Sequence, residues 1–122
     1  MEYQILERNG EAWIVISGAL DAVGTLKAQE TATHILDGQA RSVTFDFKDL
    51  GFIDPSGIGF LVFLYKRLRT MGRSLKIVGL CGQPARLLRK LNLDGPLNAT
   101  FLNEHVAVNS AIEVEAPLLR AS

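Results

Sequence analysis

The sequence predicts an α/β fold: a single domain with a mixed, mostly parallel sheet of four to five strands and about four helices. From Trp13 onward, short β-rich apolar runs alternate with longer segments of helical periodicity, as is typical of parallel strands joined by helices. An Asn9-Gly10 turn between two early apolar runs predicts a hairpin, which adds an antiparallel edge. A chain of 122 residues can bury one substantial core but not two ordinary ones.

The predicted hairpin joins a strand over Tyr3–Arg8 to a strand over Ala12–Ser17. In the second strand, Trp13–Ile16 is apolar at successive positions, which favours a central strand that is buried on both faces.

A first helix is predicted over Ala22–Leu36, and Asp37-Gly38 ends it. Its inward stripe is expected to contain Leu26, Ala32 or Thr33, and Leu36. Asp21 stands near its start, where a carboxylate can accept hydrogen bonds from unpaired amides.

The central stretch begins with a strand over Val43–Phe47 and continues through a turn, Asp54-Pro55-Ser56-Gly57. Because Pro55 biases the preceding residue away from helical geometry, regular helix is expected from Ser56 to about Thr70. The serine oxygen would cap this helix and would also occupy a place that suits added negative charge. The buried face of this helix is expected to contain Leu61, Leu64, Tyr65 and Leu68, which recur at helical spacing. The other apolar residues lie around its first turns, where something besides the sheet would have to cover them: Ile58, Phe60, Val62 and Phe63.

The rest of the chain repeats the alternation of strand and helix. The predicted elements are a strand over Leu75–Leu80, a short helix over Gln83–Leu91, a short strand over Ala99–Leu102 and a helix over Glu104–Glu113. The domain is expected to span residues 1–115, with a frayed tail over residues 116–122.

Functional loops of such a sheet gather at the carboxyl ends of its strands. The segments Gly18–Asp21, Leu50–Ser56 and Gly79–Gly82 are expected to meet there.

Charge and composition exclude several classes of protein. Thirteen basic and thirteen acidic residues cancel, which does not suggest a nucleic-acid-binding protein. A run without acids between Lys66 and Lys90 could steer an acidic partner or anionic lipid, but a solvated helix surface is the favoured interpretation. The sequence has no secretory signal pattern and no apolar run of the ~20 residues needed to cross a bilayer, so membrane insertion is not expected and a cytoplasmic protein is predicted.

No catalytic residues, metal or cofactor are expected. Ser56 lacks the surroundings of a catalytic nucleophile, because the two histidines, His34 and His105, lie in predicted helices far along the chain. Gly57 and Gly59 do not form a phosphate-binding motif and more simply permit close backbone approach. Cys81 is the sole cysteine, which precludes a cysteine cluster for metal. A binding module therefore fits better than an enzyme.

The central stretch resembles the signature of the STAS domain family, named for sulfate transporters and anti-sigma factor antagonists. The resemblance is carried by Phe45-Asp46, by Ile53-Asp54-Pro55-Ser56-Gly57-Ile58-Gly59 with Leu61, and by Gly18-Ala19-Leu20-Asp21. It implies a STAS-like fold over nearly the whole chain.

The anti-sigma factor antagonists of this family imply a function. There, the serine before the glycine is phosphorylated by an anti-sigma factor that is a serine kinase, and the matching residue here is Ser56. The unmodified protein would bind the kinase, phosphorylation would break the complex, and a PP2C-type phosphatase would restore it. Pro55 stands where the antagonists commonly have another serine or a threonine. The implied partner-binding residues are Asp21, Asp54, Pro55, Ser56, Gly57, Ile58 and Phe60.

A second function belongs to a different class. The chain could be a non-switching STAS subunit of a membrane lipid or anion transport complex, bound through its helix faces. In either case, the apolar first turns of the Ser56 helix could support a homodimer.

Overall fold

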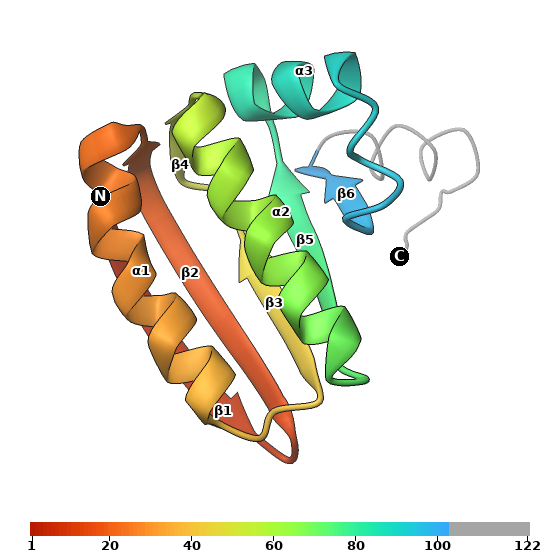
Figure 1. Ribbon diagram of the computed structural model, residues 1–122. Coiled ribbons are helices and arrows are strands. Elements are labelled where there is room, and N and C mark those ends of the chain that lie inside the picture. The colour runs from red at the N-terminus through yellow and green to blue at the C-terminus, as the bar shows by residue number, and fades with distance from the viewer. Residues whose placement is uncertain (103–122) are drawn as a thin grey trace.

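The structure, a computed structural model, describes residues 1–102 (Figure 1). Its elements are β1 (Glu2–Arg8), β2 (Glu11–Leu20), α1 (Ala22–Asp37), β3 (Ser42–Asp46), β4 (Leu50–Ile53), α2 (Pro55–Thr70), β5 (Ser74–Leu80), α3 (Gly82–Lys90) and β6 (Ala99–Phe101). The predicted helix Glu104–Glu113 and the tail over residues 116–122 lie outside the described residues.

The strands form one mixed sheet. Five of them lie in the order β1-β2-β3-β5-β6, and the sixth, β4, pairs with β2 but is not part of this order. The β1–β2 pair is antiparallel and the other pairs are parallel. The α/β fold with a mostly parallel sheet is therefore confirmed, but the described sheet has six strands, not four to five. The missed strand is β4, which lies in the segment Leu50–Ser56 that was expected to be a loop.

The predicted hairpin turn is confirmed. Asn9 and Gly10 both have positive φ angles, 54° and 81°. Two successive left-handed residues match the twist of the flanking strands, and this requirement is why Asn-Gly is a strong turn signal.

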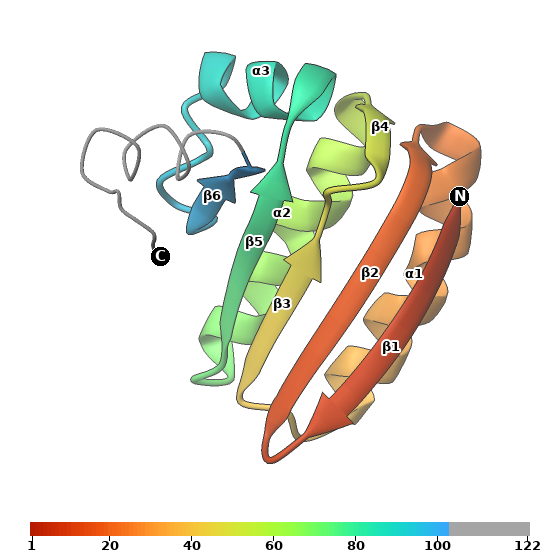
Figure 2. The same cartoon turned by 180° about the vertical axis from the view of Figure 1, so that it is seen from behind.

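α1 and α2 lie side by side on one face of the sheet, while α3 crosses the end of it (Figure 1). Seen from behind, the strands lie in front of both helices (Figure 2). Inward residues of β2 such as Ile14 are fully buried, whereas Trp13 on the other face is 37% exposed. The expectation that β2 is buried on both faces was wrong, because none of the three described helices covers the second face.

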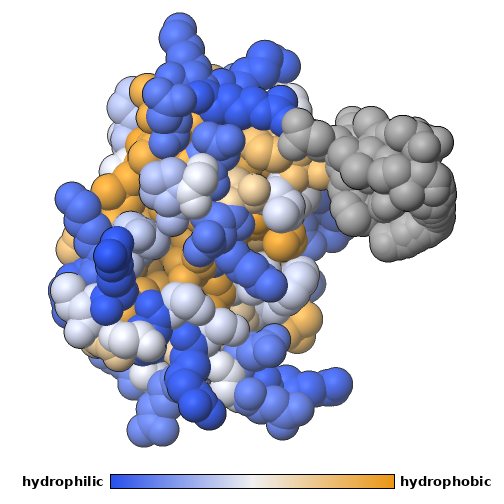
Figure 3. Space-filling view, turned by 90° about the vertical axis from the view of Figure 1, so that its right-hand side faces the viewer, coloured by the Kyte–Doolittle hydropathy of each residue, from blue (hydrophilic) through white to orange (hydrophobic). Residues whose placement is uncertain are grey.

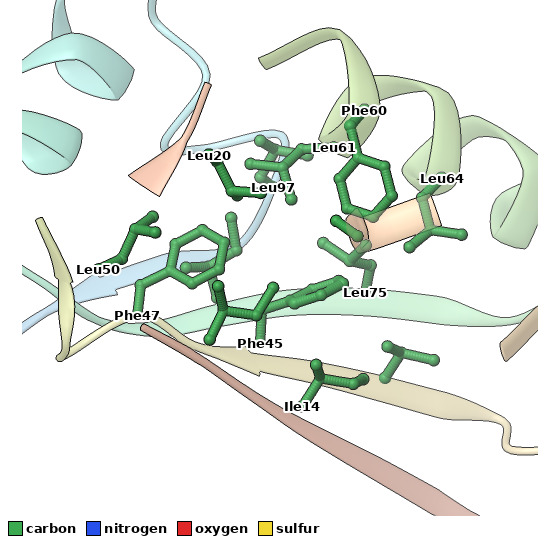
Figure 4. Close-up of a cluster of buried hydrophobic side chains, with 14 of the residues drawn as sticks. Ile14, Leu20, Phe45, Phe47, Leu50, Phe60, Leu61, Leu64, Leu75 and Leu97 are labelled. Atoms are coloured by element: carbon green, nitrogen blue, oxygen red, sulfur yellow. The ribbon is translucent and has the colours of Figure 1, made fainter. Parts of the chain in front are cut away.

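The core lies between the sheet and the two helices, and Figure 4 shows its side chains. Phe60 of α2 meets Phe45 of β3 edge to face, with ring centroids 6.3 Å apart and planes at 77°. Leu61, Leu64 and Leu68 of α2 are fully buried, as predicted from their spacing.

The predicted inward stripe of α1 is wrong at Leu26, which is 68% exposed. The buried face is made mostly of small residues: Gly24, Thr25, Ala28, Thr31, Ala32 and Ile35. Small side chains let the helix axis lie close to its neighbours, so packing here overrides the preference for large apolar residues.

Arg73 is one of the basic residues that could have steered a partner. Its guanidinium instead donates hydrogen bonds to the carbonyl of Ile35 (2.7 Å), in the last turn of α1, and to the carbonyl of Ala40 (2.6 Å), in the loop that follows. This arginine therefore stabilises the helix terminus.

Apolar residues also reach the surface. On the side shown in Figure 3, a hydrophobic band runs through the middle, with hydrophilic residues above and below it. In the part of the chain that is described, no helix combines the length and the apolar character required to cross a bilayer.

Candidate functional site

The candidate site lies where β2 and β4 end side by side. Leu20 pairs with Ile53 in parallel register, and the next residue along, Asp54, donates its backbone N–H to the Leu20 carbonyl (3.2 Å). After these paired residues the chain enters α1 through Asp21 and α2 through Asp54. The two loops therefore meet at the carboxyl end of the sheet, as the sequence predicted.

Asp54 is the N-cap of α2. Its Oδ1 accepts hydrogen bonds from the backbone N–H groups of Ser56 (2.8 Å) and Gly57 (3.3 Å). Pro55 is the first helical residue, a position where its missing N–H costs nothing. The predicted start at Ser56 was one residue late, and the capping role expected of Ser56 belongs to Asp54.

Ser56 is exposed in the first turn of α2. Because Asp54 holds the Ser56 backbone amide, the helix start does not depend on the serine hydroxyl. The site thus presents a hydroxyl to solvent on a well-anchored turn.

Asp21 has the equivalent role for α1. Its Oδ1 accepts a hydrogen bond from the Gly24 backbone N–H (2.8 Å), which confirms the predicted place of this carboxylate at a helix start. Two capping carboxylates therefore stand at the same end of the sheet.

Gly57 is buried against β2. A Cβ at this position would lie 2.5 Å from the Leu20 carbonyl oxygen and 2.6 Å from Ile53 Cγ1, so the close backbone approach predicted for this glycine is confirmed. The same prediction was wrong for Gly59, where a Cβ would meet nothing within 4 Å.

The remaining predicted site residues differ in exposure. Pro55 is exposed and Ile58 is partly buried. Phe60 is 6% exposed and packs on the core. The structure thus brings Asp21, Asp54, Pro55, Ser56 and Ile58 to one accessible end, and places Gly57 and Phe60 beneath it.

Sequence reasoning missed two exposed apolar side chains, each two residues along the chain from one of the capping aspartates. Phe52 of β4 is 44% exposed, and Val23 in the first turn of α1 is 76% exposed. Phe52 was missed because its segment, Leu50–Ser56, was expected to be a loop and not a strand. The sequence did contain a signal for a strand here, because Phe52 stands beside Ile53 and aromatic and β-branched residues are enriched in strands.

The described residues contain no group of three or more histidine, cysteine, aspartate or glutamate side chains that could hold a metal. His34 lies 3.0 Å from Glu7 (Nε2 to Oε1) on the outside of α1, and Cys81 is partly buried. His105 lies outside the described residues.

Solved structures share this fold. The anti-sigma factor antagonist SpoIIAA in its unphosphorylated form aligns with a TM-score of 0.70 and 19% identity, over 90% of this chain and 96% of its own. The phosphorylated form from Bacillus aligns with a TM-score of 0.66 and 17% identity, over 90% and 99%.

Two further relatives widen the comparison. An anti-sigma factor antagonist from Mycobacterium paratuberculosis aligns with a TM-score of 0.74 and 15% identity, over 88% of this chain and 92% of its own. A sulfate transporter family protein from Wolinella succinogenes gives 0.64 and 14%, over 84% and 87%. At these identities the likeness concerns the fold.

The family model of the STAS domain matches residues 2–107, which is most of the chain. Together with the paired strand ends and the turn before α2, this match leads to one conclusion: the chain belongs to the STAS domain family.

Proposed function

We propose that this protein is an anti-sigma factor antagonist in a partner-switching pathway. It binds a serine-kinase anti-sigma factor when unphosphorylated, is released when Ser56 is phosphorylated, and is restored by a PP2C-type phosphatase. The observation that carries the proposal is the exposed Ser56 in the first turn of α2, close in the chain to the Asp54 carboxylate. SpoIIAA, which shares the fold, has been solved in unphosphorylated and phosphorylated forms.

The electrostatics of the turn favour a switch by charge. A phosphate adds roughly −1.5 to −2 charges at pH 7. A helix start ordinarily stabilises an anion through its free amides, but Asp54 already accepts from the N–H groups of Ser56 and Gly57. A phosphate on Ser56 therefore adds to the charge of the cap instead of being neutralised, and it opposes the desolvation that docking requires.

The proposed docking surface combines these charges with apolar contacts. Asp21, Asp54, Pro55, Ser56 and Ile58 would face the partner, while Gly57 and Phe60 would shape the surface from below. Phe52 and Val23 add apolar area at the rim. The protein would act in the cytoplasm, on proteins and not on nucleic acid, and without catalysis of its own. The apolar first turns of α2 could also serve a homodimer.

The decisive experiment uses candidate serine kinases from the same genome. Incubation with ATP and mass spectrometry should find phosphate on Ser56, and Ser56→Asp should lose kinase binding while Ser56→Ala binds constitutively. Equal affinity of the two variants for the kinase would remove the switch.

The docking surface can be mapped with a matched pair of variants. Phe52→Ser should weaken kinase binding, since it removes exposed apolar area at the rim. Leu6→Ser is the control, because Leu6 is similarly exposed (62%) but lies on β1, paired with Trp13 away from the site.

The fold shared with the Wolinella sulfate transporter family protein favours a second candidate, a STAS subunit of a membrane lipid or anion transport complex. Affinity purification of the tagged chain from detergent-solubilised membranes tests it. Recovery of a transport complex that binds Ser56→Asp and wild type equally would favour this candidate over the switch.

A further inference from the structure

β4 is a short strand with irregular pairing, although it leads directly into the candidate site. It has four residues, and its pairing with β2 is interrupted by a register shift between Gly18 and Ala19. Only its first and last side chains, those of Leu50 and Ile53, are buried. The edge of β4 that faces away from β2 would leave backbone N–H and C=O groups without partners unless another group paired with them.

The side chain of Gln83 supplies that pairing. Gln83 lies in the first turn of α3, which crosses the end of the sheet (Figure 1). Its amide accepts a hydrogen bond from the Ile53 N–H (2.9 Å) and donates one to the Ile53 carbonyl (2.8 Å). The next two residues of α3, Pro84 and Ala85, are buried, so the backbone that carries Gln83 is itself anchored. Ile53 is thus held between Leu20 of β2 and Gln83 of α3.

The position of Ile53 decides where the neighbouring docking residues lie. Phe52, which is 44% exposed, immediately precedes Ile53, and Asp54 immediately follows it. The Asp54 carboxylate in turn holds the backbone amides of Ser56 and Gly57. One side-chain amide therefore fixes the backbone that carries both an exposed apolar residue and the exposed serine.

We propose that Gln83 is a positioning residue for the docking surface: it holds Phe52 and Ser56 in the arrangement that the serine kinase recognises. This inference rests on the proposed function. It adds that α3, which contributes none of the proposed docking residues, determines how well the surface is recognised. Without the Gln83 amide, β4 would open locally, and only a fraction of the folded chains would present the surface in its ordered form.

Gln83→Met is the test variant, because methionine matches the length of glutamine but cannot reproduce the pair of hydrogen bonds. Phosphorylation of Ser56 is followed with the candidate kinase that modifies the wild-type protein. The KM for this protein should rise about three- to tenfold, since the kinase binds only the ordered fraction of chains. The kcat should stay within about twofold of wild type, because a chain that is already bound is ordered.

Arg73→Met is the matched control. It also removes two side-chain hydrogen bonds to backbone groups, the carbonyls of Ile35 and Ala40, but at the opposite end of the sheet. Arg73→Met should lower stability and leave the KM as in wild type. A rise of the KM in Gln83→Met alone therefore separates positioning from a general loss of stability.

Amide hydrogen exchange tests the same role without a kinase. In Gln83→Met the amides of Ser56 and Gly57 should exchange at least about threefold faster than in wild type, and in Arg73→Met they should not. Equal exchange in Gln83→Met and wild type, an unchanged KM, or the same rise of the KM in Arg73→Met would each overturn the proposal. If no candidate kinase modifies wild-type Ser56, the proposed function fails, and the exchange rates still decide whether Gln83 orders the turn.

Discussion

The side-chain amide of Gln83 forms two hydrogen bonds with the backbone of Ile53, in the same way as a neighbouring strand would. Its Oε1 accepts from the Ile53 N–H (2.9 Å), and its Nε2 donates to the Ile53 carbonyl (2.8 Å). α3 thereby completes the outer edge of β4, the strand that leads directly into Asp54 and Ser56. The conformation of the candidate site is thus tied to a helix that begins about thirty residues later in the chain.

Gln83→Ala should lower the free energy of unfolding by about 1–3 kcal/mol, since it leaves two partly buried backbone groups of Ile53 without partners. Urea denaturation measures the loss, and hydrogen exchange of the Ile53 amide should accelerate. Gln39→Ala is the control, because Gln39 is an exposed residue of the same type, and no change is expected there. An Ile53 amide equally protected in Gln83→Ala would contradict the role of the side chain.

Asp54→Ala should cost about 0.5–2 kcal/mol, as expected for loss of an N-cap, whereas Ser56→Ala should change stability by less than about 0.5 kcal/mol. Asp54→Asn keeps an accepting oxygen and should recover most of the loss. The comparison is made by urea unfolding of the three variants. A larger cost for Ser56→Ala than for Asp54→Ala would show that the serine is the cap after all.

Gly57→Ala and Gly59→Ala should have opposite effects. At Gly57 the new methyl group would collide with the Leu20 carbonyl oxygen, and overpacking of this kind costs about 1–3 kcal/mol. At Gly59 the methyl group meets open space inside a helix, so alanine should stabilise by about 0.5–1 kcal/mol. Thermal unfolding of both variants checks the signs, and two changes in the same direction would refute this account of the turn.

Lys48 provides a prediction at alkaline pH. Hydrogen bonding to Asp46 (3.1 Å), with its charge attraction, raises the pKa of Lys48 above the ordinary value of 10.5. A raised pKa means that the folded state holds the proton more tightly than the unfolded state does. The stabilisation is therefore complete below pH 10.5 and is lost as the pH rises through the raised pKa.

The measurement is the stability difference between wild type and Lys48→Met, followed from pH 8 upward by urea unfolding. The difference should shrink as Lys48 loses its proton. Lys48→Arg, which stays charged, should keep its advantage over Lys48→Met at high pH. A wild-type advantage that does not change with pH would mean that the ion pair contributes nothing measurable.

Much of this fold was predictable because its signals are local. The Asn9-Gly10 turn, the carboxylate at Asp21 and the spacing of Leu61, Leu64 and Leu68 each act within a few residues of the chain. Apart from the missed strand β4, the predicted order of strands and helices up to Phe101 is confirmed, and it follows from such signals.

What could not be predicted depends on contacts between distant segments. β4 is short, pairs with β2 and is completed by Gln83, so no periodicity marks it. The buried face of α1 is set by how closely the helix lies on the sheet, which selects Ala28 and Thr31 over Leu26. In the candidate site, the exposure of Phe52 follows from the missed strand.

The division of labour between Asp54 and Ser56 has a consequence for how such a domain can change over time. Because the Asp54 carboxylate caps the helix, the hydroxyl of Ser56 is not needed to hold the helix start. A lineage could gain, lose or replace the hydroxyl at little expense to folding, and the same scaffold could drift between reversible and permanent association with its partners.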